Sequence, residues 1–151
     1  MIKIICVGKI KEEFYRDAIK EYLKRLSKYE KIEIIECKDY SDLPINDILL
    51  KESVEIEKNI NSRDYVITLE IDGKQLSSVE LAQKINNIYL TNSNITFIIG
   101  GSYGLHDNIK RISNFKLSFS NLTFPHQLFR VILLEQIYRS FKINNNESYH
   151  K

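Results

Sequence analysis

The feature that most constrains the fold of this chain is an alternation, repeated five times, of a short apolar run and a segment with helical spacing. The apolar runs cover residues 2–7, 31–37, 65–71, 95–99 and 115–119. The helical segments cover residues 11–26, 45–60, 77–88, 107–112 and 127–142. Strands alternating with helices are typical of a mostly parallel sheet with helices on both faces. We therefore expect an α/β fold.

Local signals support two of these boundaries. Ser77 and Glu80 form an S-x-x-E pattern ahead of an apolar periodic segment, which predicts a capping box at the start of a helix. Asp72-Gly73 follows the third apolar run and predicts a turn that closes that strand.

The composition indicates one globular domain over residues 1–151. The chain has 43% hydrophobic and 28% charged residues, with 5 Gly and 2 Pro, which is enough apolar material for a single core. No apolar run approaches the ~18 residues of a membrane span, and no signal peptide is recognised, so we expect a cytoplasmic protein. Cys6 and Cys37 stand alone in apolar runs and predict buried thiols rather than a disulfide or a metal site.

Charge is divided unevenly along the chain. Residues 1–99 hold 15 Lys and Arg against 17 Asp and Glu, whereas residues 100–151 hold 7 against 3 and all 3 His. A basic surface attracts a polyanion such as RNA, although an ordinary solvated surface explains the same charges equally well.

Two loops at strand ends suggest a cofactor site. The run 95–99 leads into a glycine turn at residues 100–104, and the run 115–119 leads into the uncharged loop 120–125. Glycine lets a backbone approach a ligand closely, and a small uncharged loop suits adenine. No G-x-G-x-x-G follows the first strand and no P-loop occurs, which disfavours a dinucleotide or a Walker-type site.

Several separated motifs then occur in one order along the chain. They are Val7-Gly8-Lys9, residues 68–74 (TLEIDGK), residues 98–105 (IIGGSYGL), residues 117–126 (LSFSNLTFPH), Arg130-Val131, residues 135–139 (EQIYR) and residues 149–151 (YHK). Together they resemble the H-type methyltransferases of large-subunit ribosomal RNA pseudouridine, which belong to the SPOUT superfamily. The resemblance covers the whole chain.

The resemblance implies both a fold and an activity. It implies a homodimer with a C-terminal trefoil knot, one of the rare exceptions to unknotted topology. It also implies that S-adenosylmethionine supplies a methyl group to N3 of a pseudouridine in a stem-loop of the 23S rRNA, on the assembled ribosome, with no metal.

By the same resemblance, a defined set of residues surrounds the cofactor: Leu69, Gly100, Phe119, Ser120, Asn121, Leu122, Thr123 and Phe124. Without it, Leu69, Phe119 and Phe124 would be predicted as core residues, because apolar side chains in strands are usually buried. Gly100, Ser120 and Asn121 are harder to explain by packing.

The chemistry asked of such a protein is mainly positioning, because the sulfonium is already an activated methyl donor. His126 and Arg130 are four residues apart at the start of the last helix, so we expect both beside the cofactor loop. Arg130 suits a phosphate or a developing uracil anion, and His126 suits a base or an orienting group. The polar segment 144–147 is expected to be flexible, and the tail with Tyr149 and His150 is expected to close over the target base.

The helix at 127–142 is apolar around much of its circumference, which predicts burial on two sides and hence a homodimer. Glu135 interrupts it and is expected to pair with Arg139 or to face the partner chain. Two other functions remain open from sequence: a non-catalytic ribosome-binding or RNA-binding module, and a different transferase or nucleotide hydrolase.

Overall fold

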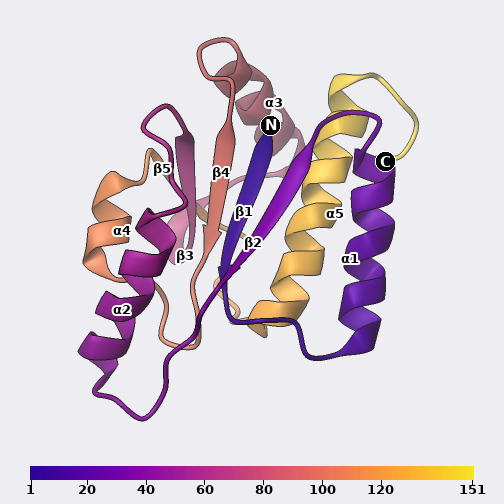
Figure 1. The fold of residues 1–151 in the computed structure, drawn as a ribbon. Helices are drawn as coiled ribbons and strands as arrows, with labels where there is room; N and C mark the ends of the chain where they lie inside the picture. Colours follow the sequence, from indigo (N-terminus) through magenta and orange to yellow (C-terminus); the bar gives the residue numbers. More distant parts are fainter.

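The computed structural model describes all 151 residues and contains five strands and five helices (Figure 1). Their order along the chain is β1 (Ile2–Val7), α1 (Glu13–Leu26), β2 (Ile32–Cys37), α2 (Ile45–Glu57), β3 (Tyr65–Gln75), α3 (Ser78–Tyr89), β4 (Ile95–Ile99), α4 (Asp107–Ile112), β5 (Phe115–Ser118) and α5 (His126–Asn144). The strands form one parallel sheet in the order β2-β1-β4-β3-β5. The predicted α/β architecture is confirmed.

Helices cover both faces of this sheet. On one face α1, α5 and α3 pack over a core that includes Ile4 and Cys6, and on the other α2 and α4 pack over Ile5 and Val7 (Figure 1). Side chains alternate between faces along a strand, so β1 supplies both cores in turn. This double burial explains why the central strands are mostly apolar, and the buried Lys3 of β1 is paired with Asp64 at 3.3 Å.

Strand β3 differs from its prediction. Asp72 and Gly73 do not end it, because β3 continues to Gln75 and its pairing with Leu117 of β5 shifts between Leu69 and Lys74. A Cβ at Gly73 would lie 2.8 Å from the backbone of β5, so the glycine permits the close approach of the two strands. The irregularity places Glu70 and Ile71 at the end of the sheet where the candidate site lies.

The predicted capping box is confirmed at the start of α3. The Glu80 amide donates to Ser77 Oγ at 3.1 Å, and the Ser77 amide donates to a Glu80 carboxylate oxygen at 2.6 Å. Two backbone donors that have no partner within the helix are thereby satisfied.

Both cysteines are unpaired and buried, and burial raises the pKa of the Cys6 thiol to about 12. The fold contains no helix long and apolar enough to cross a bilayer. No three His, Cys, Asp or Glu side chains are grouped in a way that would hold a metal ion. The trefoil knot stays a prediction from the resemblance.

Candidate active site

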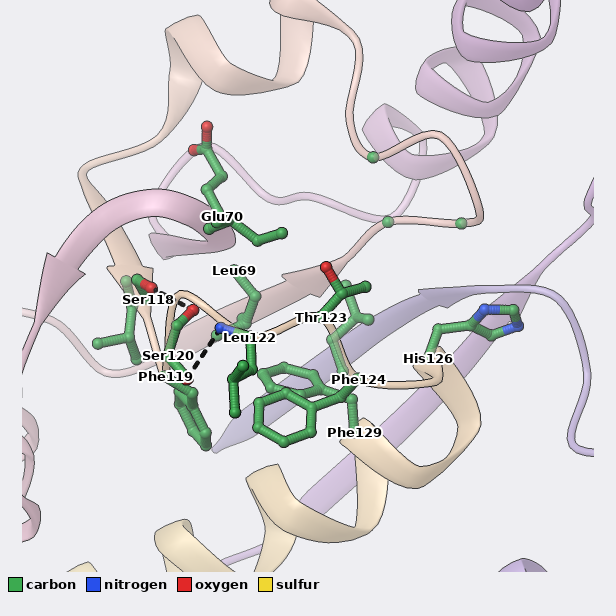
Figure 2. A pocket seen from close by; sticks show the side chains of 16 residues that line it. Leu69, Glu70, Ser118, Phe119, Ser120, Leu122, Thr123, Phe124, His126 and Phe129 are labelled. Atoms are coloured by element: carbon green, nitrogen blue, oxygen red, sulfur yellow. Dashed lines mark hydrogen bonds between the residues drawn. The ribbon is translucent and has the colours of Figure 1, made fainter.

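A cavity of about 150 Å³ lies where the carboxyl ends of β3, β4 and β5 meet (Figure 2). Loops at the carboxyl ends of parallel strands are where open α/β sheets bind ligands. The lining comes from three segments distant in sequence: residues 69–71, the turn after β4, and residues 117–129. The fold therefore brings together the two loops predicted from sequence.

The glycine turn forms the backbone wall of this cavity. Gly101 and Gly104 form an isolated antiparallel bridge, with the Gly104 amide donating to the Gly101 carbonyl at 3.1 Å. A Cβ at Gly100 would lie 2.5 Å from the Gly104 carbonyl oxygen, and Gly104 has a φ of +84°. The turn itself requires both glycines. It also leaves open space beside Gly104, because a Cβ there would meet no atom within 4 Å.

An aromatic cluster forms the opposite wall. The ring of Phe129, from the first turns of α5, lies 4.9 Å from the ring of Phe119 and 6.0 Å from that of Phe124, measured between centroids. Leu122 lies over the same space (Figure 2), and 71% of its surface is exposed. An exposed leucine beside an aromatic cluster offers apolar area that a bound ligand would cover.

Loop 119–124 is shaped by side-chain hydrogen bonds. Ser118 Oγ donates to the Ser120 carbonyl at 3.1 Å, and the Leu122 amide donates to Ser120 Oγ at 3.0 Å. Residues 119–124 take part in none of the backbone–backbone hydrogen bonds made outside helices and strands. The loop thus carries peptide groups suited to hydrogen bonding with a ligand.

The structure brings together seven of the eight residues expected around the cofactor: Leu69, Gly100, Phe119, Ser120, Leu122, Thr123 and Phe124. Asn121 is the exception. Its side chain is exposed and does not line the cavity, because its amide oxygen accepts a hydrogen bond from Gln75 at 3.2 Å. Glu70, Ile71 and Phe129 also line the cavity and were not predicted from sequence.

His126 begins α5 and lines the rim of the cavity (Figure 2). Burial lowers the pKa of its imidazole, and the nearby Arg130 guanidinium lowers it further, so the ring is neutral at neutral pH. A neutral imidazole has one acceptor nitrogen available to a substrate proton.

Arg130 does not line the cavity with His126, so the predicted place of Arg130 beside the cofactor loop is wrong. Its guanidinium is only 1% exposed and donates to a Glu36 carboxylate oxygen at 2.8 Å. It also donates to the carbonyls of Val7 and Gly8, at 2.9 and 2.8 Å. Arg130 thus fixes the end of β1 against β2 and α5. Its Nε has no partner but is buried as well, so burial rather than a lack of donors keeps this guanidinium from a phosphate.

We expect His126 to make stability depend on pH. Its pKa in the folded protein lies below the unfolded value of about 6.5, so the folded state is favoured above that pH and loses stability as the pH falls through the folded pKa. Denaturant unfolding between pH 5 and 8 should show this loss in the wild type and a smaller one in His126→Asn. An unchanged pH profile in the variant would contradict the assignment.

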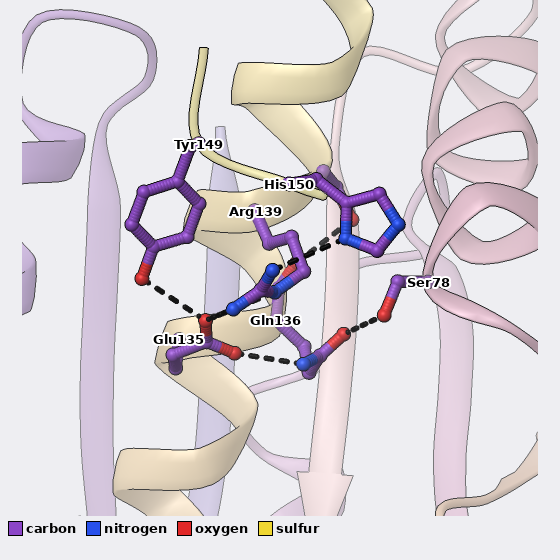
Figure 3. A network of polar contacts seen from close by, with 7 residues as sticks. Ser78, Glu135, Gln136, Arg139, Tyr149 and His150 are labelled. Atoms are coloured by element: carbon purple, nitrogen blue, oxygen red, sulfur yellow. Dashed lines mark hydrogen bonds and ion pairs between the residues drawn. The ribbon is translucent and has the colours of Figure 1, made fainter.

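The C-terminal tail packs on α5 (Figure 3). The Tyr149 hydroxyl donates to a Glu135 carboxylate oxygen at 3.1 Å, Arg139 lies over the Tyr149 ring at 4.7 Å, and the His150 Nδ1 lies 3.1 Å from the Arg139 guanidinium. The predicted pairing of Glu135 with Arg139 is confirmed, with Arg139 Nε donating at 3.0 Å. The network continues through Gln136 to Ser78 of α3.

The polar segment 144–147 is anchored, contrary to the predicted flexibility. Glu147 accepts hydrogen bonds from Lys142 at 2.8 Å and from the Tyr29 hydroxyl at 2.8 Å. These two partners lower the pKa of Glu147 to about 2.

Tyr149 and His150 are therefore not part of the cavity in the same chain. Their contacts Glu135 and Arg139 lie nine and thirteen residues after His126 on one helix. At a rise of about 1.5 Å per residue, this separates them from the cavity rim by more than ~13 Å along the axis.

Comparisons with known proteins agree with this geometry. A family model described as "Predicted SPOUT methyltransferase" matches residues 1–150. A protein of Methanococcus maripaludis strain C5 is 57% identical over 99% of both chains, and one of Methanococcus vannielii is 56% identical over the same shares. Both are described as "Putative ribosomal RNA large subunit methyltransferase H". The chain belongs to the SPOUT methyltransferase family.

A solved structure shares the fold. It is described as a "probable methylase family protein" from Haemophilus influenzae and aligns with a TM-score of 0.58 at 13% identity, over 99% of this chain and 70% of that one. The five-stranded parallel sheet with helices on both faces is thus the SPOUT methylase fold.

Proposed function

We propose that this protein methylates N3 of a pseudouridine in large-subunit ribosomal RNA, using S-adenosylmethionine bound in the cavity at the ends of β3, β4 and β5. The observation that carries the proposal is the cavity itself, formed by the glycine turn and loop 119–124 in a SPOUT methyltransferase. The description of the two Methanococcus relatives as ribosomal RNA methyltransferases supports ribosomal RNA as the substrate.

The lining suits a sulfonium nucleoside better than a phosphate. It contains aromatic and aliphatic side chains, small polar groups and peptide bonds, but no Lys or Arg, and Glu70 is its one carboxylate. A nucleotide hydrolase would need cations at the phosphates, usually a lysine and a metal held by carboxylates. The cavity therefore favours S-adenosylmethionine over the hydrolase that the sequence left open.

The chemistry follows from position. The cofactor supplies an electrophilic methyl group, and the protein holds the N3 atom in line with the departing sulfur. Neutral His126 at the rim is placed to accept the N3 proton or to orient the base. Arg130 acts at a distance, because its hydrogen bonds hold the β1 loop beside His126.

Leu122 provides a test of the cofactor assignment. Truncation by Leu122→Ala should weaken S-adenosylmethionine binding by about tenfold. Leu122 is mostly exposed in the free protein, so a bound ligand that covers its side chain gains ~1.5 kcal/mol or more of binding free energy from burial of this apolar area. Calorimetric titration measures this change. Leu90→Ala is the matched control, since Leu90 is 81% exposed and lies outside the cavity. Equal affinities of the two variants would remove loop 119–124 from the site.

The same titration distinguishes the proposed enzyme from a non-catalytic ribosome-binding module. A non-catalytic ribosome-binding module would bind ribosomes through its basic C-terminal third and give no heat with S-adenosylmethionine. The proposed enzyme binds both.

We also propose a homodimer in which each tail reaches the partner's site. No residue of α5 is fully exposed, yet Leu128 and Ile132 are only half-buried in one chain. A second copy packed on this face would complete their burial. It would also bring Tyr149 and His150 of one chain close to the cavity of the other, although they lie far from the cavity of their own chain.

The dimer predicts a specific effect of charge on α5. Ile132→Lys should convert a dimer into a monomer at micromolar concentration in analytical ultracentrifugation, because burying an unpaired lysine at an interface is costly. Val54→Lys, on the exposed side of α2, is the control and should stay dimeric. A monomeric wild type would contradict the proposal.

A further inference from the structure

A second and more polar hollow adjoins the cofactor cavity. It has a volume of about 480 Å³ and lies over the ends of β1 and β2, with Asp39, Tyr40, Glu52 and Tyr103 in its lining. It shares Gly101 and His126 with the cofactor cavity. A ligand in this hollow is therefore next to the rim where methyl transfer is proposed to occur.

Glu52 is the unusual group in this hollow. It projects from α2 and is only 5% exposed, although it forms no ion pair and no hydrogen bond to another side chain. A Cβ at Gly101 would lie 3.4 Å from Glu52 Oε1, so the carboxylate lies against the glycine that both cavities share.

The surroundings of Glu52 supply no cation for its carboxylate. Burial raises the pKa of the carboxyl, and the nearby Asp39 raises it further, while the Tyr40 backbone amide lowers it. A buried carboxylate without a cation costs stability unless a hydrogen-bond donor reaches it. No side chain of the protein donates a hydrogen bond to Glu52, so a ligand in the hollow could supply this donor.

The side chains that line the hollow favour a nucleotide base over a phosphate group as its ligand. Asp39 and Glu52 repel a phosphate, so the backbone of an RNA is not the occupant. A neutral base with in-plane N–H groups satisfies a carboxylate, and the exposed Tyr103 offers a ring for stacking. Pseudouridine has two such groups, N1–H and N3–H, on either side of the C2 carbonyl. Uridine has only N3–H, because its N1 carries the ribose.

We propose that this hollow holds the target base and that Glu52 accepts a hydrogen bond from the N1–H of pseudouridine while N3 faces the cofactor cavity across Gly101 and His126. The inference rests on the proposed function and adds the residue that distinguishes pseudouridine from uridine. With uridine at the target, Glu52 keeps only the Tyr40 backbone amide as a donor. A site built around such a hydrogen bond rejects the analogue that lacks it by up to ~10⁴-fold.

The test compares matched ribosomes that carry either pseudouridine or uridine at the target position. The wild type should methylate the pseudouridine ribosomes at least ~100-fold faster. Glu52→Leu removes the acceptor, and the ratio of the two rates should fall toward one. Glu52→Gln keeps a neutral acceptor, which is weaker than a carboxylate, so its ratio should lie between the two. Glu57→Leu, an exposed change on the same helix, should retain the wild-type ratio.

Two further readouts separate this role from a structural one. Affinity for S-adenosylmethionine should be unchanged in the Glu52 variants, because Glu52 does not line the cofactor cavity. The denaturation midpoint of Glu52→Gln should equal or exceed that of the wild type, whereas a structural carboxylate would destabilise the protein when neutralised.

The outcomes are distinct. If the wild type transfers no methyl group to either ribosome, the proposed function fails and this inference fails with it. If the wild type is active and the folded Glu52→Leu variant keeps its preference for pseudouridine, only the inference is overturned. If Glu52→Leu does not fold, the test uses Glu52→Gln. The inference is overturned if Glu52→Gln keeps the wild-type ratio of the two methylation rates and has a lower denaturation midpoint than the wild type.

Discussion

Removal of residues 148–151 is expected to reduce methyl transfer to ribosomes by at least ~100-fold while leaving S-adenosylmethionine affinity nearly unchanged. Tyr149 packs on Tyr138 and bonds Glu135, but neither Tyr149 nor His150 lines the cofactor cavity of its own chain. Loss of the tail therefore removes groups proposed to act on the partner's substrate. Steady-state methylation and calorimetry on the same preparation measure the two effects.

Single substitutions assign the effect within the tail. Loss of activity in His150→Ala but not in Tyr149→Phe would indicate an imidazole contact with the base, and Ser148→Ala serves as an exposed control. A truncated protein with the normal methylation rate would contradict a catalytic tail and leave His126 as the remaining candidate.

Replacement of Arg130 by alanine is expected to lower the free energy of unfolding by about 3 kcal/mol or more. The substitution deprives the Val7 and Gly8 carbonyls of their donor and leaves Glu36 with the Ile10 amide but no cation. The carbonyls dominate this cost, because the Glu36 side chain is 33% exposed and partly solvated. Urea unfolding at pH 7 measures the change.

Arg25→Ala is the matched control for Arg130→Ala. Arg25 pairs with Glu21 at the surface, and an exposed pair contributes at most about 1 kcal/mol. If Arg130→Ala were as stable as the wild type yet inactive, the guanidinium would have to reach the substrate, contrary to its buried position.

Much of the fold was predictable because local sequence and packing agree. The apolar run of β1 is buried on both faces, and the Ser77 and Glu80 capping box starts α3 where the sequence indicates. The turn predicted at Asp72-Gly73 was wrong, because the same residue types occur both in turns and at irregularities within a strand. Only the pairing of β3 with β5 shows that these two residues lie within the strand.

Part of the site was predictable from residues that packing does not explain and from the family resemblance. Gly100 and Ser120 stood out as residues that packing does not explain, and the resemblance placed Leu69 and Phe124 beside them. Arg130 was misplaced, because helical spacing puts two side chains near each other but does not say where a long side chain ends.

Glu52 was not singled out from sequence, since an acidic residue on an amphipathic helix is usually exposed. Its burial follows from the packing of α2 against the end of the sheet, which brings it to Gly101. That contact joins residues 49 positions apart and leaves no local pattern.

The recognition of RNA is expected to depend on the assembled ribosome. The formal net charge of +2 is too small to hold naked RNA by phosphate contacts alone, since tight complexes neutralise ~6 to 10 phosphates. Shape and base contacts on a structured surface must supply the rest.

The proposed activity can be measured by incubating the wild-type protein with methyl-labelled S-adenosylmethionine and whole ribosomes, then locating the label in digested large-subunit RNA by mass spectrometry. We expect one methyl group on N3 of a single pseudouridine, and far less label on the free RNA stem-loop under the same conditions. Equal labelling of free RNA would contradict the dependence on the ribosome. A protein that binds S-adenosylmethionine but labels no pseudouridine in either substrate would contradict the proposed function.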